Sequence, residues 1–393
     1  MATTNKVKTI GVLTSGGDAP GMNAAIRAAV RRGLQKGVQM KGILKGYDGL
    51  MNEEIIDMTA RDVSDTIERG GTILYTARCA EMRTPEGQKR AADVCRKHGI
   101  DGLVVIGGDG SFAGAQKLAA LGINTVGVPG TIDLDIACTE YTIGFDTAVN
   151  TAMEAIDKVR DTSTSHERCS VIEVMGRNAG WLTAASALAR IEGRKVPQLI
   201  YLCEKAFDED RFIEDVNEAL KKENNIIIAV SEGVKTADGN YVGEETKSGK
   251  EDVFGHKYLS GVGKYLEGLV GEKIGCKVRS VELNILQRCA GYMLSETDIM
   301  ESRNLGAFAA VSAIRGKSGK MSAVRRISDD PYQVEIVLSD LSKIANYEKK
   351  VPMEWINEEG NDIKDELLTY LKPLIQGEVQ IPYENGIPKR FIL

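Results

Sequence analysis

Three short turns in the first 135 residues combine glycines with a carboxylate, a combination suited to binding phosphate and metal. One of them, Gly107 to Ser111, follows an apolar strand-like run and precedes a helix-like stretch. Its glycines let the backbone approach a ligand closely, and the free N–H groups at a helix start attract anions. Asp109 in this turn could hold a divalent cation against those phosphates. Because Gly16 to Asn23 and Gly130 to Asp135 repeat the arrangement, the sequence predicts phosphoryl chemistry.

Two carboxylates, Asp133 and Asp135, stand two residues apart in the third turn. If that segment is extended, their side chains point to the same side. Such a pair suits a division of labour, in which one carboxylate accepts a proton from a hydroxyl group and the other faces metal or water. Purely structural interpretations also exist, namely an Asx-turn for this pair and a capped strand-to-helix turn for Asp109.

Arginines recur beside the ends of predicted strands, where they could bind anions. Arg78 follows a glycine-containing segment, and Arg177 lies between a predicted strand and a predicted helix. Arg168, Arg279 and Arg288 also border strand-like runs. Any one of them could equally be a surface residue or the partner in an ion pair. Their repeated position favours phosphate recognition, because a guanidinium fork matches the geometry of phosphate oxygens.

The composition of the chain argues against several classes of protein. Its net charge of −6 disfavours general binding of nucleic acid. The seven cysteines are odd in number and no two have CxxC spacing, so we expect reduced thiols rather than disulfides or a zinc site. No apolar run approaches the roughly 18 residues that span a bilayer, and the polar N-terminus lacks the apolar stretch of a signal peptide. We therefore expect a cytoplasmic protein that binds neither nucleic acid nor membranes.

The elements that must position these residues alternate between strand-like and helix-like patterns. Strands are expected near residues 8–14, 39–45, 102–107, 124–128, 170–175, 197–202, 225–231 and 277–283. Helices are expected near residues 21–36, 61–69, 86–98, 112–120, 146–160, 179–190, 208–222, 257–271 and 294–314. This alternation predicts an α/β fold with mostly parallel sheets, in which ligands lie beyond the C-terminal ends of the strands. The segment 346–365 is rich in charge, and we expect it to lie on the surface.

Nine segments of this chain resemble, in order and spacing, the motifs of the ATP-type 6-phosphofructokinase family. They are TSGGDAPGMNAAIR (14–27), RGGTILYTAR (69–78), IGGDGS (106–111), PGTIDLD (129–135), YTIGFDTAVNT (141–151), DTSTSHER (161–168), VMGRNAGW (174–181), SEG (231–233) and LQR (286–288). The resemblance runs from residue 7 to about residue 310, and the remainder of the chain resembles the family weakly.

The resemblance implies a fold of two Rossmann-like three-layer α/β/α domains with the active site in the cleft between them. An ATP-binding domain is expected over residues 1–144 plus about 288–338, and a fructose 6-phosphate-binding domain over residues 145–287 plus about 339–393. The implied reaction is the glycolytic transfer of a phosphoryl group from MgATP to the 1-hydroxyl of D-fructose 6-phosphate, with Mg²⁺ as cofactor. The family also implies a homo-oligomer, a tetramer or a dimer, whose subunits share active sites.

The family motifs assign roles to individual residues by similarity. The residues implied in catalysis are Asp133, Arg78, Arg177 and Thr131, with Asp133 as the base. The nucleotide side would contain Gly17, Arg78, Asp109, Gly110, Ser111 and Gly114, with Asp109 as the Mg²⁺ ligand. The sugar side would contain Thr131, Asp133, Asp135, Met175, Gly176, Arg177, Glu232 and Arg288. Arg168 and Arg279 match positions that reach the sugar 6-phosphate from a neighbouring subunit.

The chain departs from the family pattern at three places. Leu134 replaces a polar amide between the two carboxylates of the third turn. Ile285 stands where short bacterial members often carry a substrate-binding histidine. A longer basic segment, from Arg190 to Pro197, replaces a short glycine-rich loop that helps those members bind an allosteric nucleotide.

Two other functions are compatible with the same scaffold. One is a pyrophosphate-dependent fructose 6-phosphate 1-phosphotransferase, towards which the segment 175–181 and the length of the chain lean slightly. Gly110 and Gly130 point the other way, because pyrophosphate-using relatives carry Asp and Lys at these two positions. The other is a non-catalytic sugar-phosphate-binding paralogue, which the apolar bulk of Leu134 suggests.

Overall fold

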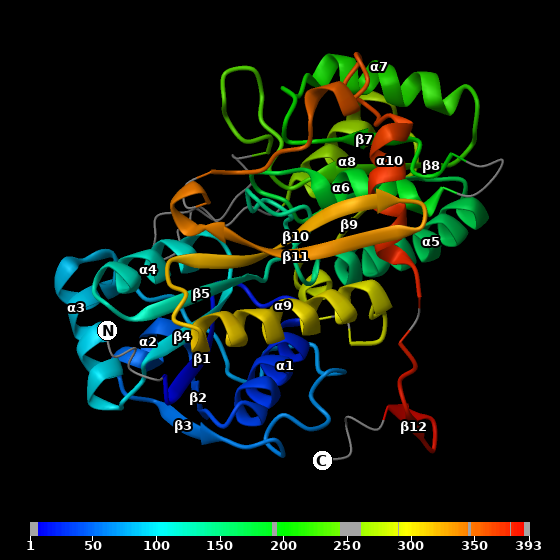
Figure 1. Ribbon diagram of the computed structural model, residues 1–393. Coiled ribbons are helices and arrows are strands. Elements are labelled where there is room, and N and C mark those ends of the chain that lie inside the picture. Colours follow the sequence, from blue (N-terminus) through cyan, green and yellow to red (C-terminus); the bar gives the residue numbers. More distant parts are fainter. Residues whose placement is uncertain are drawn as a thin grey trace.

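Two α/β units make up the molecule, one coloured blue to cyan and the other green in Figure 1, and the last part of the chain runs back across both. The computed structural model describes residues 7–190, 195–243, 261–289, 291–344, 347–377 and 379–388. Within these ranges, no helix combines the length and the apolar character needed to cross a membrane.

The first unit is built around a seven-stranded sheet with the strand order β11-β10-β5-β4-β1-β2-β3. Its strands are β1 (Thr9–Ser15), β2 (Gln39–Ile43), β3 (Ile55–Met58), β4 (Gly102–Gly107), β5 (Asn124–Pro129), β10 (Lys320–Asp329) and β11 (Tyr332–Asp340). The central strands are parallel, and β3 and β11 pair antiparallel at the two edges. A late hairpin of the chain therefore completes a sheet that begins at its N-terminus.

The second unit contains a four-stranded, fully parallel sheet with the order β7-β8-β6-β9. Its strands are β6 (Cys169–Val174), β7 (Leu199–Tyr201), β8 (Ile226–Ser231) and β9 (Val278–Glu282). A short antiparallel pair, β12 (Tyr383–Glu384) and β13 (Ile387–Pro388), lies near the C-terminus.

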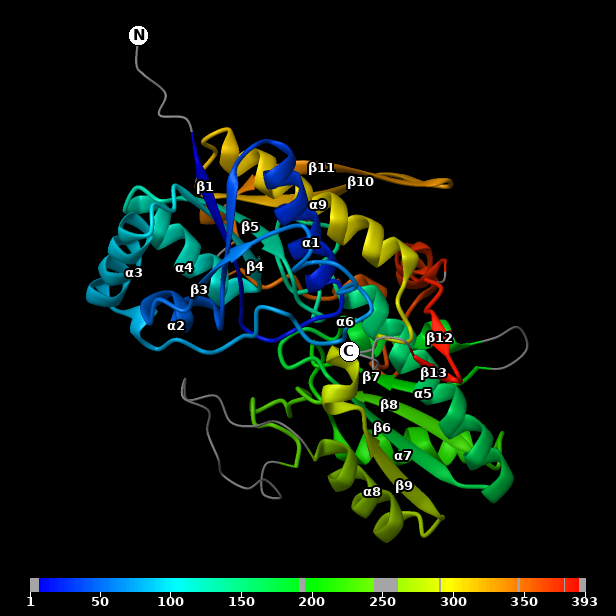
Figure 2. The same ribbon diagram turned by 90° about the horizontal axis from the view of Figure 1, so that it is seen from below.

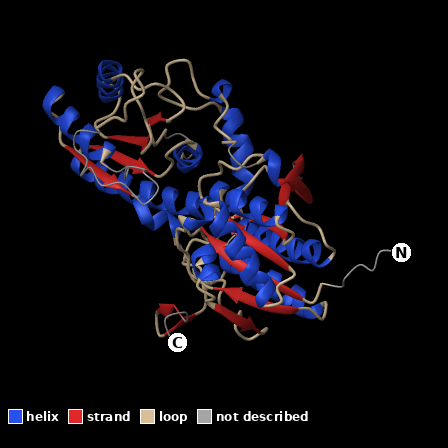
Figure 3. Ribbon diagram, turned by 90° about the vertical axis from the view of Figure 1, so that its left-hand side faces the viewer, coloured by secondary structure: helices blue, strands red, loops and turns tan. Residues whose placement is uncertain are grey.

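Helices flank the strands of both units (Figure 3). They are α1 (Met22–Gln35), α2 (Gly46–Met51), α3 (Pro85–Lys97), α4 (Asp109–Ala120), α5 (Phe145–His166), α6 (Trp181–Ala185), α7 (Glu209–Leu220), α8 (Val262–Lys273), α9 (Glu296–Ile314) and α10 (Asp365–Leu371). Figure 2 shows α1 and α9 side by side in the first unit. Gly306 makes this approach possible, because a Cβ there would lie 2.3 Å from the Ala25 carbonyl oxygen.

The layered packing follows from the alternation of side chains along each strand. In β4, Leu103 and Val105 belong to the core cluster that contains Phe112 of α4. Val104 and Ile106 point to the opposite face and belong to the cluster that includes α1 and α9. All four strand residues are fully buried, which explains why this strand reads as an unbroken apolar run.

The predicted α/β class is confirmed, and each predicted strand has a counterpart within a few residues. The helix predicted over 61–69 is wrong: the segment forms turns, and Asp65 has a φ of 52°, which an α-helix does not allow. Of the helix predicted over 257–271, residues 257–260 lie outside the described residues, and α8 begins at Val262. The elements α2 and β3 and the β10–β11 hairpin were not predicted.

Candidate active site

The three carboxylate-bearing turns meet at one edge of the first sheet. Because β5, β4 and β1 are adjacent and parallel, the turns that follow them share the C-terminal edge. The Gly130 N–H donates to the Gly107 carbonyl oxygen over 3.0 Å, and the Ser111 hydroxyl donates to the Ser15 carbonyl oxygen over 2.9 Å. A Cβ at Gly107 would lie 2.4 Å from that Ser15 oxygen, so this close packing requires glycine.

The start of α4 combines glycines with one carboxylate, as the sequence indicates. Asp109 is its first residue and Gly108 its N-cap, and no side chain caps the helix. The first N–H groups of an uncapped helix attract anions. Gly110 is exposed, and nothing lies within 4 Å of the position that its Cβ would take. Gly114, one turn further on, has a different surrounding, because its Cβ position is 2.8 Å from the Tyr47 ring.

Asn23, a buried residue of α1, holds the segment that leads to Arg78. Its Nδ2 donates to the Gly71 carbonyl oxygen over 2.8 Å, and its Oδ1 accepts from the Ile73 N–H, also over 2.8 Å. Arg78 itself is exposed, so its guanidinium can reach a ligand. Asn23 lies in the first motif, but sequence reasoning gave it no role.

The carboxylate pair of the third turn does not have the extended conformation that would align its side chains. Leu134, between the two carboxylates, has a φ of 56°, a left-handed conformation that is strained for leucine. The Leu134 side chain is fully buried in the hydrophobic core, so it packs there and not on the surface of the candidate site. The Asp133 N–H donates to Thr131 Oγ1 over 3.2 Å, and the Thr131 hydroxyl donates to Asp133 Oδ2 over 3.3 Å.

The turn after β6 carries Met175, Gly176 and Arg177, and side chains of the second unit hold its backbone. The Met175 N–H donates to Gln287 Oε1 over 3.0 Å, and the Gly176 N–H donates to Glu232 Oε1 over 3.3 Å. Gly176 has a φ of 142°, which favours glycine at this position. Because Glu232 follows β8, the adjoining ends of β6 and β8 build this part of the site.

Arg288 links the two halves of the candidate site. It ends a short 3₁₀ helix, Asn284–Arg288, and its Nη1 donates to the Asp18 carbonyl oxygen over 3.4 Å. A Cβ at Gly17 would lie 2.6 Å from the same nitrogen. A residue expected on the sugar side thus contacts the turn expected on the nucleotide side. Ile285, in the same 3₁₀ helix, is 67% exposed.

Several carboxylates lie close enough to influence one another. Burial, followed by the negative charge of Asp133, raises the pKa of Asp135 to about 7, with smaller contributions from Glu348 and Asp109. Burial also raises the pKa of Glu232 to about 7, and the charge of Asp133 adds to this shift. Asp133 therefore acts on carboxylates from both units, and the site concentrates negative charge that positive ligands or metal ions can offset.

Arg168 and Arg279 lie at the other end of the second sheet. Arg168 directly precedes β6 and Met175 directly follows it, so the length of this strand separates Arg168 from Met175 by about 20 Å. Arg279 lies on the neighbouring strand β9, where it pairs with Ser170. The Nε of Arg168 is buried and forms no hydrogen bond within the described ranges. In one chain, these arginines do not join the other candidate residues.

Glu348 is a residue of the site that sequence reasoning missed. Its carboxylate accepts from Asn178 Nδ2 over 2.6 Å and contributes to the raised pKa of Asp135. It belongs to the charged segment that we expected on the surface. That expectation is wrong for Val351 and Ile356, which are buried. Their spacing matches neither a strand nor a helix, so the sequence carried no periodic signal for this burial.

The raised pKa of Glu232 predicts a pH-dependent free energy of unfolding. The native state keeps a proton that the unfolded state releases near pH 4.5, so stability falls as the pH rises from there to about 7. Relative to a Glu232→Gln variant, the unmodified protein should lose about 2 kcal/mol between pH 5 and pH 8. Urea unfolding of both proteins at the two pH values measures this difference, and equal changes in both would contradict it.

The chain is similar to known phosphofructokinases over most of its length. A sequence model of the family described as phosphofructokinase matches residues 9–314. An ATP-dependent 6-phosphofructokinase from Clostridium botulinum is 50% identical over 283 residues, which cover 71% of this chain and 86% of that protein. The ATP-dependent 6-phosphofructokinase of Clostridium tetani is 51% identical over 283 residues, covering 70% of this chain and 86% of that protein.

A solved structure extends the similarity to the last part of the chain. The pyrophosphate-dependent phosphofructokinase from Marinobacter aquaeolei superposes with a TM-score of 0.87 at 26% identity. The match covers 97% of this chain and 95% of that one. The relatives of higher sequence identity are thus named for ATP, whereas this structural relative is named for pyrophosphate.

Proposed function

The chain belongs to the phosphofructokinase family, and we propose that it transfers the γ-phosphoryl group of ATP to the 1-hydroxyl of fructose 6-phosphate. The observation that carries this proposal is the uncapped start of α4 at Asp109, which lies beside the carboxylate turn 131–135. One element can receive phosphate oxygens, and the other can receive the proton of an attacking hydroxyl.

In this proposal, Asp133 is the general base. It accepts the proton of the sugar 1-hydroxyl as that oxygen forms a bond to the γ-phosphorus. The bond from the γ-phosphorus to the β–γ bridging oxygen breaks, and ADP leaves. The contact with Thr131 orients the Asp133 carboxylate. Arg78, Arg177 and the N–H groups at the start of α4 stabilise the negative charge on the transferring group.

The residues present fit the Mg²⁺ that the family implies. Among the described residues, no group of three or more His, Cys, Asp or Glu is arranged to hold a metal ion. Mg²⁺ does not need such a cage, because it commonly binds one or two carboxylates together with substrate phosphates. Asp109 would hold it here, and the charge of Asp109 already reaches Asp135. When bound, the ion supplies positive charge that neutralises phosphate oxygens.

We propose that the unit with the seven-stranded sheet binds the nucleotide and that the other unit binds the sugar. The proposed nucleotide side contains Gly17, Arg78, Asp109, Gly110, Ser111 and Gly114, although Gly114 is also explained by its packing against Tyr47. The proposed sugar side contains Thr131, Asp133, Asp135, Met175, Gly176, Arg177, Glu232 and Arg288. The hairpin β10–β11 supports a nucleotide domain of residues 1–144 plus about 288–338, since it joins the first sheet.

Phosphorus NMR tests the reaction itself. With ATP, Mg²⁺ and fructose 6-phosphate, we expect the γ-phosphate signal to be lost while a second sugar phosphomonoester signal grows in equal amount. Assignment of the new signal to the 1-position identifies the acceptor hydroxyl. Loss of ATP without phosphorylation of the sugar, or no reaction at all, would contradict the proposal.

We further propose a homo-oligomer in which Arg168 and Arg279 bind the sugar 6-phosphate of a neighbouring subunit. Two observations support this: both arginines lie far from the turn at Met175 in their own chain, and the buried Nε of Arg168 forms no hydrogen bond within the described residues. A buried guanidinium nitrogen gains free energy when it pairs with an anion.

Subunit mixing tests the shared site. We expect Arg168→Ala to raise the KM for fructose 6-phosphate at least about tenfold, because a charge-assisted contact with phosphate is lost. Mixed oligomers of Arg168→Ala and Asp133→Asn subunits should regain activity, since some sites then combine an intact arginine with an intact base. Verified hybrids that show no regain of activity would place the site within one chain.

A further inference from the structure

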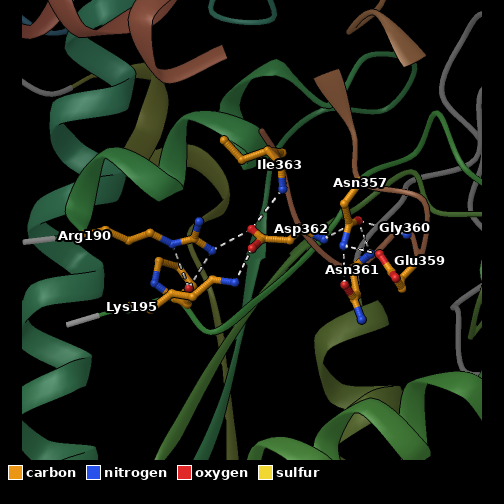
Figure 4. Close-up of polar contacts among 9 residues, drawn as sticks. Arg190, Lys195, Asn357, Glu359, Gly360, Asn361, Asp362 and Ile363 are labelled. Carbon is orange, nitrogen blue, oxygen red and sulfur yellow. Dashed lines mark hydrogen bonds and ion pairs between the residues drawn. The ribbon is translucent and has the colours of Figure 1, made fainter. Parts of the chain in front are cut away.

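Residues 347–363, which we call the C-terminal strap, lie outside the part of the chain matched by the family model. The strap is anchored on the second unit. Figure 4 shows the Asp362 carboxylate facing both the Arg190 guanidinium and the Lys195 ammonium, and the distance from Arg190 Nη2 to Asp362 Oδ1 is 2.7 Å. The Ile200 N–H of the edge strand β7 donates to the Asn361 carbonyl oxygen over 2.8 Å. Backbone pairing and ion pairs thus fix this end of the strap.

Figure 4 also shows how the strap turns before this anchor. Asn357 Oδ1 accepts from the N–H groups of Gly360, Asn361 and Asp362 over 2.9, 3.1 and 3.0 Å. One amide oxygen therefore closes the turn and presents the Asp362 carboxylate to its two cations. The strap thus holds Arg190 and Lys195, two residues of the basic segment 190–197.

The other end of the strap pairs with the turn that carries the proposed base. The Lys349 N–H donates to the Asp135 carbonyl oxygen over 2.8 Å, and Glu348 forms an antiparallel bridge with Ile136. The Lys349 ammonium donates to the Thr139 carbonyl oxygen over 3.2 Å and also to the Glu140 carbonyl oxygen. The strap is therefore bonded to the backbone on both sides of the turn after Asp135.

The same two strap residues also hold the turn after β6. Asn178 Nδ2 donates to Glu348 Oε1 over 2.6 Å, and Trp181 Nε1 donates to the Lys349 carbonyl oxygen over 2.9 Å. Asn178 directly follows Arg177, which we propose to stabilise the charge of the transferring phosphoryl group. One short segment thus links the turn of the proposed base to the turn of the proposed charge-stabilising arginine.

We infer that Glu348 is a positioning residue for the proposed reaction, and that it sets the Met175–Arg177 turn against the Asp133 turn through Asn178. This inference rests on the proposed function. The Met175 and Gly176 N–H groups donate to Gln287 and Glu232, and the 3₁₀ helix of Gln287 contacts the first unit through Arg288 and the Asp18 carbonyl. The strap adds a second link, which joins Asn178 to the turn that carries the proposed base. Without the Glu348 side chain, Trp181 stays bonded to Lys349, but Asn178, next to Arg177, loses its contact with the strap.

The hydrogen bond of Glu348, rather than its charge, carries this role. A negative charge beside Asp135 disfavours ionisation of that carboxyl group, so the charge by itself brings no benefit to a site rich in carboxylates. Glutamine keeps an acceptor oxygen at the same reach, whereas alanine removes it. The two substitutions therefore separate positioning from electrostatics.

The test compares Glu348→Ala, Glu348→Gln and Asn178→Ala with a control from the same strap, Glu354→Ala. The Glu354 side chain is exposed, as that of Glu348 is, but it forms no hydrogen bond within the described residues. We expect Glu348→Ala and Asn178→Ala each to raise the KM for fructose 6-phosphate about fivefold, the scale of one solvent-exposed hydrogen bond to a charged group. The double variant should be no worse than either single variant. Glu348→Gln and Glu354→Ala should stay within about twofold of the unmodified protein.

Amide hydrogen exchange of the ligand-free protein measures how firmly the Met175–Arg177 turn is held, and it does not depend on catalytic activity. We expect the peptide covering residues 175–181 to exchange about tenfold faster in Glu348→Ala and at the original rate in Glu348→Gln. Unchanged exchange in Glu348→Ala, or an unchanged sugar KM, would overturn the inference, as would additive effects in the double variant. If the unmodified protein does not phosphorylate the sugar, the proposed function fails, and the exchange rates still decide whether Glu348 positions the turn.

Discussion

Asp133→Asn is expected to lower kcat at least about a hundredfold, because general-base catalysis typically contributes about 10²–10⁴-fold. Asparagine keeps the shape of the side chain, and its oxygen can still accept the hydrogen bond from the Thr131 hydroxyl. It cannot accept the proton of the attacking hydroxyl at neutral pH. The KM for fructose 6-phosphate should therefore change little while turnover is lost.

A matched control separates this effect from a general loss of an aspartate. Asp93 lies on the exposed surface of α3, where it pairs with Arg96, and Asp93→Asn should leave kcat unchanged. Steady-state kinetics of the two variants with saturating ATP give the comparison. Near-normal kcat in Asp133→Asn would remove Asp133 from the role of base, whatever its position in the structure.

Gly110→Asp is expected to reduce kcat/KM for ATP at least about a hundredfold. The position lies in the first turn of α4, at the proposed phosphate site, and its Cβ would point into open space. A carboxylate there would occupy the room that the α-phosphate and nucleoside of ATP require. It would also repel the phosphate, by about 4 kcal/mol for unit charges 4 Å apart at an effective dielectric constant near 20.

Gly110→Ala is the control for the change of backbone. Alanine adds a methyl group that meets nothing within 4 Å and is favoured in helices, so ATP use should stay within a few fold. An aspartate in the first turn also favours the helix, which makes unfolding a poor explanation for lost activity in Gly110→Asp. Equal activity of the two variants would show that this position does not determine use of ATP.

The predictable part of the fold consists of elements with a strong periodic signal. The unbroken run 103–106 belongs to a strand buried on both faces, and the glycines after it mark a turn in which no Cβ fits at Gly107. The helix predicted over 61–69 fails for a local reason, the left-handed backbone at Asp65. The hairpin at residues 320–340 did carry a signal in its second strand, where Tyr332, Val334 and Ile336 alternate with polar residues after Asp330-Pro331.

The site was predictable where glycine and carboxylate motifs follow strands, because parallel strands bring their ends together. Two features were not predictable in this way. Leu134 takes a left-handed conformation that an alternating pattern cannot anticipate, so the expected alignment of Asp133 and Asp135 fails. Glu348 reaches the site through tertiary pairing with Ile136, more than 200 residues earlier in the chain. Its charged surroundings in the sequence resemble those of any surface segment.

The central claim, that ATP is the phosphoryl donor, meets its most direct test in the unmodified protein. The measurement is kcat/KM for ATP and for pyrophosphate, each determined with saturating fructose 6-phosphate and Mg²⁺. With glycine at positions 110 and 130, we predict efficient use of ATP and little activity with pyrophosphate. A higher kcat/KM for pyrophosphate would contradict the account and would group the enzyme with its structural relative from Marinobacter aquaeolei.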